Sequence, residues 1–311
     1  MRIAADTIRQ AGFPFHQLDR YLKILVQDLN RNVAISEEYP NDVSAKVKSG
    51  GLMHDRRVSR IITPGTLIDE NFMDPLSNNY VLAIHIEDGA LTPSTSDLNH
   101  DTSVGLAWLD LSTGQFFTQK VPLTEIPSFL ARVSPREIVL DQKLEAHNHI
   151  LGVFGDDRQL IAYAKVPDVR PIEEWSAMLE SPVPPSAAGH FTEQEIAAGS
   201  CLLYYIGTRL QGSDLKLQPP VRQLDLMGID KNTMRALEIK KTIREDNFSG
   251  SLLHTVRRTA TKGGARLLEN WLGAYLEEQE KILLSNDLNS FPVNFSGRNQ
   301  PSIGLGRIHA K

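Results

Sequence analysis

Residues 104–121 read VGLAWLDLSTGQFFTQKV, and this stretch decides the fold class. Two β-rich runs, 104–110 and 115–121, flank the turn Ser112-Thr113-Gly114, which predicts a hairpin. Strands are also expected at 80–86, 137–140 and 159–164, and a short helix at 123–132. Strands that come first and then alternate with helix predict a mixed sheet covered by helices.

The block before this sheet predicts a small α/β module. One helical face is expected over residues 15–30, where apolar side chains recur with a period of 3.6 residues. Strands are expected at 33–35 and 57–62, and the polar segment 41–51 between them, with Gly50-Gly51, reads as a loop or hairpin tip.

The block after the sheet is helical. A Pro-rich linker at 181–189 precedes Phe191, Thr192 and Glu195, which fit a hydrophobic staple, an N-cap and a capping box. The helix that begins there is expected to run to about Leu210. Further helices are expected at 231–243, 251–258 and 264–272.

Length, charge and cysteine content restrict the class of protein. A chain of 311 residues predicts two or three domains. The net charge of −5 divides into zero for residues 1–78 (10 basic, 10 acidic), −8 for 79–190 (7 and 15) and +3 for 191–311 (16 and 13). Any nucleic-acid contact should therefore come from a flank. One cysteine, Cys201, excludes a disulfide framework and a Cys-rich zinc site, and no apolar run approaches the roughly 18–20 residues of a membrane span.

Motifs for enzymatic chemistry are scarce. The sequence contains no G-x-x-x-x-G-K-[ST] phosphate loop, G-x-S-x-G elbow, H-E-x-x-H or C-x-x-C. We interpret His147-Asn148-His149 as a solvated helix end and Cys201 as a buried structural thiol, so no metal ligand and no catalytic residue is assigned.

Acidic residues leave two interpretations of the middle block. Asp88, Asp110 and Asp141 each follow or end an expected strand. A nuclease of the RNase H type holds two metal ions with acids at such places. Strand ends also carry acids simply because they meet water, and we favour this interpretation.

Basic residues gather in two places that suit phosphate contacts. Lys46, Lys48, Arg56 and Arg57 flank the Gly50-Gly51 turn and are our candidate DNA-binding residues, with the acids expected on the other edge of the module. Arg60 lies nearby but alternates with Val58. The alternative is a solvated hairpin. The second set is Arg235, Lys240, Lys241, Arg244, Arg257, Arg258, Lys262 and Arg266.

Five blocks resemble the N-terminal half of MutS-type DNA mismatch-repair proteins, in the family's order. They contain Ala11-Gly12-Phe13-Pro14-Phe15-His16, Thr63-Pro64-Gly65-Thr66-Leu67, Asp110-Leu111-Ser112-Thr113-Gly114, Leu237-Glu238 and Trp271-Leu272. The sequence of residues 104–140 most resembles the mitochondrial MutS homologue of filamentous fungi.

The resemblance implies an α/β and α multi-domain plan. Residues 1–75 would be part of the mixed α/β mismatch-binding domain, 79–188 the RNase H-like connector, 191–272 the start of the all-α lever domain, and 273–311 a divergent tail.

The resemblance also implies function. The family binds double-stranded DNA with mismatches and hydrolyses ATP with Mg, and its connector contacts repair factors. The family's Phe-x-Glu mismatch reader lies upstream of the segment matched by Ala11, so Phe191-Thr192-Glu193 is not its equivalent.

We therefore expect a mismatch-repair fragment, truncated at both ends, that lacks the reader and the ATPase domain. It would be a DNA-binding chain without enzymatic activity or cofactor, and not a membrane protein. The alternatives are a metal-dependent nuclease and a protein-interaction module, with self-association or repair factors as partners. A mitochondrial location is implied although no presequence is visible, with the nucleus as the alternative.

Overall fold

The computed structural model describes residues 12–40, 54–67, 76–87, 102–165, 169–210, 216–223, 226–227, 229–273 and 275–276. Within them, no helix is long and apolar enough to cross a bilayer.

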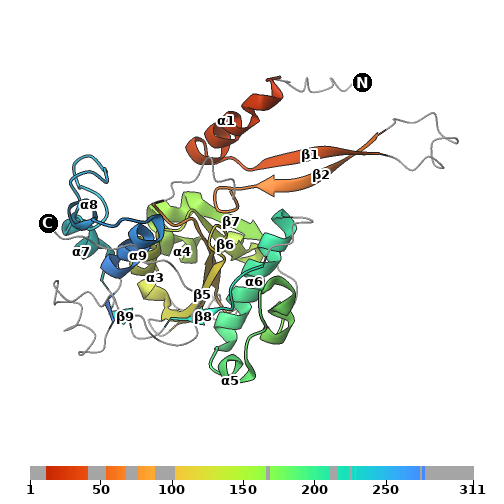
Figure 1. The fold of residues 1–311 in the computed structure, drawn as a ribbon. Coiled ribbons are helices and arrows are strands. Elements are labelled where there is room, and N and C mark those ends of the chain that lie inside the picture. The colour runs from red at the N-terminus through yellow and green to blue at the C-terminus, as the bar shows by residue number, and fades with distance from the viewer. Residues whose placement is uncertain are drawn as a thin grey trace, which may run out of the picture.

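A mixed six-stranded sheet forms the centre of the molecule (Figure 1). The strands β3 (Tyr80–His85), β4 (Ser103–Asp110) and β5 (Gln115–Pro122) form an antiparallel meander. The strands β6 (Glu137–Asp141) and β7 (Ile161–Ala164) continue parallel to β3, and the short β8 (Val221–Arg222) lies parallel to β5 at the other edge. The order β7-β6-β3-β4-β5-β8 confirms the mixed sheet predicted from residues 80–164.

Each face of the sheet carries its own hydrophobic core, because successive side chains of a strand point to opposite faces. Leu82, Ile84 and Trp108 belong to the core that includes α3 (Ile126–Val133) and α4 (Asn148–Leu151). The 3-10 segments Leu123–Glu125, Gln142–Ala146 and Gly152–Leu160 join them on this side.

The opposite face is covered by α6 (Glu193–Arg209) and by the 3-10 segment Ile172–Met178, with the short α5 (Pro185–Ala188) before α6. The sequence assigned this helix to the start of a helical domain, but here it packs on β3 and β4. Because both faces of the sheet are apolar, the second face needs this cover. Cys201 on α6 is buried as expected, and burial raises the pKa of its thiol to about 12.

The N-terminal module projects from the sheet (Figure 1). The 3-10 turn Phe15–Gln17, α1 (Leu18–Lys23) and the π-helical turn Ile24–Asp28 precede an antiparallel hairpin of β1 (Val33–Pro40) and β2 (His54–Ile62). We call the described residues of 12–67 the arm. Its small core consists of Leu22 and Val26 from the helical face, with Ile62 and Leu67. The α/β module predicted from the sequence is confirmed, with longer strands.

The C-terminal helices are α7 (Lys231–Ala236), α8 (Leu252–Val256) and α9 (Lys262–Gly273), and both α7 and α9 contact α3. The short strands β9 (Leu226–Met227) and β10 (Tyr275–Leu276) pair with each other. The helix expected over 231–243 ends early, because Glu238 has a left-handed φ of +48° that a helix cannot continue through. That these helices begin a lever domain, and that 273–311 is a divergent tail, stay predictions, and most of the tail lies outside the described residues.

Candidate nucleic-acid interface

The hairpin of the arm carries two of the four residues predicted to contact DNA. Across the hairpin, Arg56 lies opposite Glu38 and Arg57 lies opposite Glu37. Successive side chains of a strand point to opposite faces, so Arg56 and Arg57 do not share a face of the hairpin. The other two candidates, Lys46 and Lys48, lie outside the described residues.

Arg56 already has an anionic partner. Its Nε and Nη2 atoms donate to Glu38 Oε1 at 2.9 and 2.5 Å, and the side chains are 75% and 51% exposed. An exposed pair of this kind stabilises by roughly 0.2–1 kcal/mol, so a phosphate is able to displace the carboxylate.

The expectation that the acids lie on the other edge of the module was wrong. Glu37 and Glu38 lie directly opposite the two arginines, because antiparallel pairing places β1 beside β2 along its whole length. The strand spacing already indicates this arrangement. Counting outward from Val33 and Ile62 in a regular antiparallel pair places Glu38 opposite Arg57, and the one irregularity at Ile35/Ser36 shifts its partner to Arg56.

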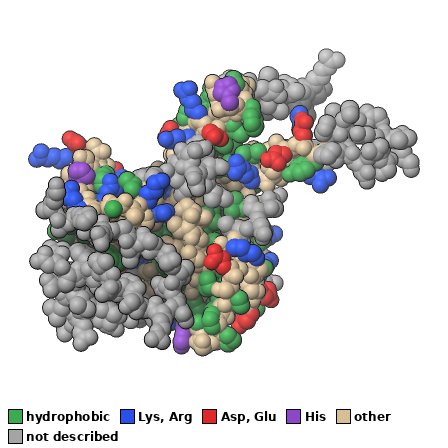
Figure 2. Space-filling view, viewed as in Figure 1, with side chains coloured by type: hydrophobic (Ala, Val, Ile, Leu, Met, Phe, Trp, Pro, Cys, Tyr) green, Lys and Arg blue, Asp and Glu red, His purple; other side chains and the backbone are tan. Residues whose placement is uncertain are grey.

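The second basic set lies on α7–α9 and their connections, where Lys and Arg side chains gather in Figure 2. Lys240 binds groups of the protein itself: its Nζ donates to the Arg132 carbonyl at 2.6 Å and lies 3.4 Å from Glu269, and burial lowers its pKa.

The remaining members of this set differ in their contacts. Lys241 pairs with Asp246 at 2.8 Å. Arg257 lies over the Phe248 ring and Arg266 donates to Ser112. The other members are exposed: Arg235, Arg244, Arg258 and Lys262.

Phe191-Thr192-Glu193 leads into α6, and that it does not read bases stays a prediction. The Thr192 hydroxyl accepts from the Glu195 amide at 3.3 Å, and the Glu195 carboxylate accepts from the Thr192 amide at 2.8 Å, which completes the predicted capping box. Phe191 packs against the core on the α6 side of the sheet.

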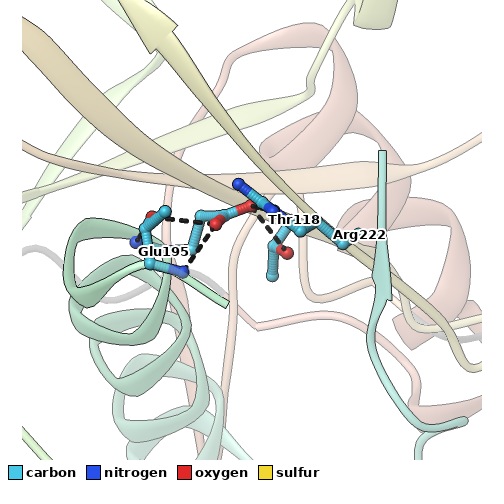
Figure 3. A network of polar contacts seen from close by, with 4 residues as sticks. Thr118, Glu195 and Arg222 are labelled. Carbon is cyan, nitrogen blue, oxygen red and sulfur yellow. Dashed lines mark hydrogen bonds and ion pairs between the residues drawn. The ribbon is translucent and has the colours of Figure 1, made fainter. Parts of the chain in front are cut away.

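The buried carboxylate of Glu195 also joins three elements (Figure 3). Its Oε1 atom accepts from Thr118 on β5 at 3.3 Å and from Arg222 on β8 at 3.0 Å. Arg222 therefore neutralises the glutamate in place, and the network fixes the first turn of α6 against the edge of the sheet.

The acids of the middle block do not converge. Asp110 is level with Tyr80 at one end of β3, whereas Asp141 follows Leu140, which is level with Ile84 at the other end. Four residues along a strand span about 13 Å, so these two carboxylates cannot share a metal ion.

Asp110 and Asp141 also have local roles. Asp110 accepts from the Ser112 amide and hydroxyl at 2.8 and 2.6 Å and from the Asn79 amide at 3.2 Å, and Asp141 accepts from the Lys143 amide at 3.0 Å. Asp88 lies outside the described residues, which hold no group of three or more His, Cys, Asp or Glu suited to a metal ion. His147 Nδ1 lies 3.0 Å from the Lys143 carbonyl.

Comparison with protein families matches three segments of the chain. MutS domain I matches residues 2–71, MutS domain II residues 79–177 and MutS domain III residues 232–284. The chain belongs to the MutS family. The match to domain I includes the whole arm, and the match to domain II includes strands β3–β7. The match to domain III includes α8, α9 and all of α7 but its first residue.

Curated relatives agree with this assignment. The DNA mismatch repair protein MutS of Rickettsia canadensis (strain McKiel) is 31% identical over 89% of this chain, and that of Rickettsia rickettsii (strain Sheila Smith) is 33% identical over 89%. MutS of Wolbachia pipientis wMel is 29% identical over 92% of the chain. The chain spans about 30% of the length of these relatives. The domain limits drawn from the sequence stay a prediction, and α6 and β8 lie between the matches to domains II and III.

Proposed function

We propose that this chain acts in DNA mismatch repair by binding duplex DNA, and that the arm makes the contact. The observation that carries the proposal is the match of MutS domain I to residues 2–71, the module that bears the basic hairpin. The relatives' printed name, DNA mismatch repair protein, supports the process.

The contact we propose is electrostatic. Lys46, Lys48, Arg56 and Arg57 each address one phosphate, and such contacts position a protein on DNA without reading its sequence. Arg56 exchanges its partner Glu38 for a phosphate when DNA binds. Binding is therefore weak and depends on salt, because each phosphate contact releases counterions.

We further propose that the chain has no enzymatic activity and holds no cofactor. The 311 residues contain no phosphate loop with its terminal Lys-Ser/Thr, and ATP and Mg are only what the resemblance implies for the full-length family. Repair factors, or a second copy of the chain, are the partners, and the location is mitochondrial by resemblance, with the nucleus as the alternative.

A salt titration on duplex DNA tests the arm. Replacing all four basic residues with Gln should lower the slope of log affinity against log salt by about 0.9 for each lost contact. The matched control removes the same charge from exposed residues of the central domain, Lys120, Lys143, Arg158 and Lys165, and should change the slope far less. An unchanged slope in the arm variant contradicts the proposal and makes Arg235, Arg244, Arg258 and Lys262 the better candidates.

The Glu38–Arg56 pair gives a second test of the same contact. Glu38→Gln removes the competing carboxylate, so duplex affinity should rise at low salt. Combined with Arg56→Gln, the gain should disappear. A gain in affinity that persists in the double variant would show that the charge of Glu38 acts on DNA at long range and not by competing for Arg56.

A further inference from the structure

The arm ends in a turn that is buried against the central sheet. After β2, Thr63 and Thr66 close a turn in which the Thr66 amide donates to the Thr63 carbonyl at 3.1 Å. Their hydroxyls lie 2.8 Å apart, and both residues are almost fully buried. A buried polar turn requires partners for its remaining groups.

One carboxylate supplies those partners. Glu137, at the start of β6, accepts through Oε2 from the Thr63 hydroxyl at 2.5 Å and from the Gly65 amide at 3.1 Å. Its Oε1 atom accepts from the Tyr205 hydroxyl on α6 at 2.5 Å. Glu137 is 3% exposed and Tyr205 is 1% exposed. The carboxylate therefore joins the arm, the sheet and α6 at one point.

The turn also fits the sheet closely. A Cβ atom at Gly65 would lie 2.5 Å from Val81 Cγ2 and 2.8 Å from Glu137 Oε2, so only glycine allows this approach. Asn79 Nδ2 donates to the carbonyls of Gly65 and Leu67, both at 3.3 Å. The end of the arm is thus held by hydrogen bonds on both sides of Gly65.

We propose that Glu137 is a positioning residue for the arm: its carboxylate fixes the turn after β2 to the sheet and to α6, and so sets the angle at which the basic hairpin is presented. The consequence for DNA binding rests on the proposed function. If the exposed cations Arg235, Arg244, Arg258 and Lys262 meet the same duplex as the hairpin, the two sets of phosphate contacts need one relative orientation, which a loosened turn does not hold.

The arm's orientation can be measured directly with spin labels. Val58→Cys on β2 and Lys120→Cys on β5 place two exposed labelling sites on the arm and the sheet, while the native Cys201 is 4% exposed and is left in place. The distance distribution between the labels should be a single narrow peak in the otherwise unchanged chain. Glu137→Ala should broaden it, and Glu137→Gln should restore it, because the amide still accepts from Thr63 and Gly65 and donates to the Tyr205 oxygen.

Thr63→Val is the milder variant, used if Glu137→Ala does not fold. It removes one donor to the carboxylate with little change in shape and should broaden the peak in part. The matched controls are the single variants Thr118→Val and Glu195→Ala. Thr118 and Glu195 form another buried hydroxyl–carboxylate contact of α6, and the hydrogen-bond partners of this glutamate lie outside the arm. These controls should lose stability but keep the narrow peak. A narrow peak in Glu137→Ala, or equal broadening in the controls, overturns the proposal.

DNA titrations on the same variants separate this inference from the proposed function. Glu137→Ala should weaken duplex binding and leave the salt slope unchanged, since the phosphate contacts themselves are retained. Broadening of the peak without DNA binding by any variant, the parent included, overturns the proposed function and supports the positioning role. Unweakened binding by a variant with a broadened peak overturns the link between orientation and affinity.

Discussion

Two buried glutamates connect α6 to the rest of the molecule, and different groups stabilise their carboxylates. Glu195 has the guanidinium of Arg222 at 3.0 Å, whereas Glu137 is held by the hydroxyls of Thr63 and Tyr205 and the amide of Gly65. Burial raises the pKa of the Glu137 carboxyl, and its three hydrogen bonds and the charge of Arg209 oppose that change. The stability of the fold should therefore depend on pH through Glu137.

Glu137 should make stability fall as pH rises. Its folded pKa lies above the ordinary value of 4.5, so the folded state binds its proton up to a higher pH than the unfolded state does. The contribution is complete below the unfolded pKa and is lost as pH rises through the folded pKa. Denaturant unfolding of the parent and of Glu137→Gln at a series of pH values should show the parent losing stability relative to the variant over this range. A difference that does not vary with pH would contradict the assignment.

Thr192→Ala should destabilise the chain by about 0.5–2 kcal/mol without changing DNA affinity. The variant loses the hydroxyl that accepts from the Glu195 amide at the first turn of α6. Thermal unfolding measures the first effect and a duplex titration the second. Intact stability with lost DNA affinity would mean that this segment contacts DNA and is not a cap.

Among the elements, α6 depends on two glycines for its position on the sheet. A Cβ atom at Gly105 of β4 would lie 1.9 Å from the Gln194 carbonyl oxygen, and one at Gly199 of α6 would lie 2.1 Å from Trp175 Cη2. Contacts this short cannot be accommodated without moving the helix or the indole. The close approach explains why α6 belongs with the sheet although a Pro-rich segment precedes it.

Gly199→Ala should therefore cost about 1–3 kcal/mol, as overpacking of a core does. Gly207 lies on the same helix, and a Cβ atom there would have nothing within 4 Å, so Gly207→Ala is the matched control and should be neutral or slightly stabilising. Unfolding curves give both values, and the fluorescence of the tryptophans should shift only in Gly199→Ala. Equal stabilities for the two variants would contradict the packing described for Trp175.

Elements with local signals could be predicted from the sequence. The meander at 80–122 followed from apolar runs around Ser112-Thr113-Gly114, and α6 from its capping box, because turn and cap chemistry acts over a few residues. Long-range partners had no such signal. The pairing of β8 with β5 joins Phe117 to Val221, and the contact of Thr63 with Glu137 joins residues 74 positions apart. For the candidate site, the arm's hairpin was predicted, but Glu38 as the partner of Arg56 was not.

At the scale of the whole molecule, the central sheet organises everything else that the structure describes. The arm reaches it through Glu137, α6 through both glutamates, and the C-terminal helices through α3, where Lys240 donates to the Arg132 carbonyl. The family matches follow this arrangement: domain I lies on the arm, domain II on the sheet and domain III on the C-terminal helices. The central sheet and its flanking helix α3 therefore contact both of the other matched modules.

The chain should bind a G·T mismatch no better than a homoduplex. Base contacts give specificity, and the resemblance assigns mismatch reading to a Phe-x-Glu pair. The 311 residues contain one such triplet, Phe191-Thr192-Glu193, in which Phe191 packs against the core and Thr192 caps α6. The residues that we propose for DNA contact are cations, which bind phosphates of any sequence.

Anisotropy titrations with the two duplexes should give the same affinity and the same salt slope, and ATP with Mg should change neither. A preference for the mismatch that Phe191→Ala leaves intact would locate a reader elsewhere in the chain, whereas one that Phe191→Ala abolishes would show that the start of α6 opens to meet DNA.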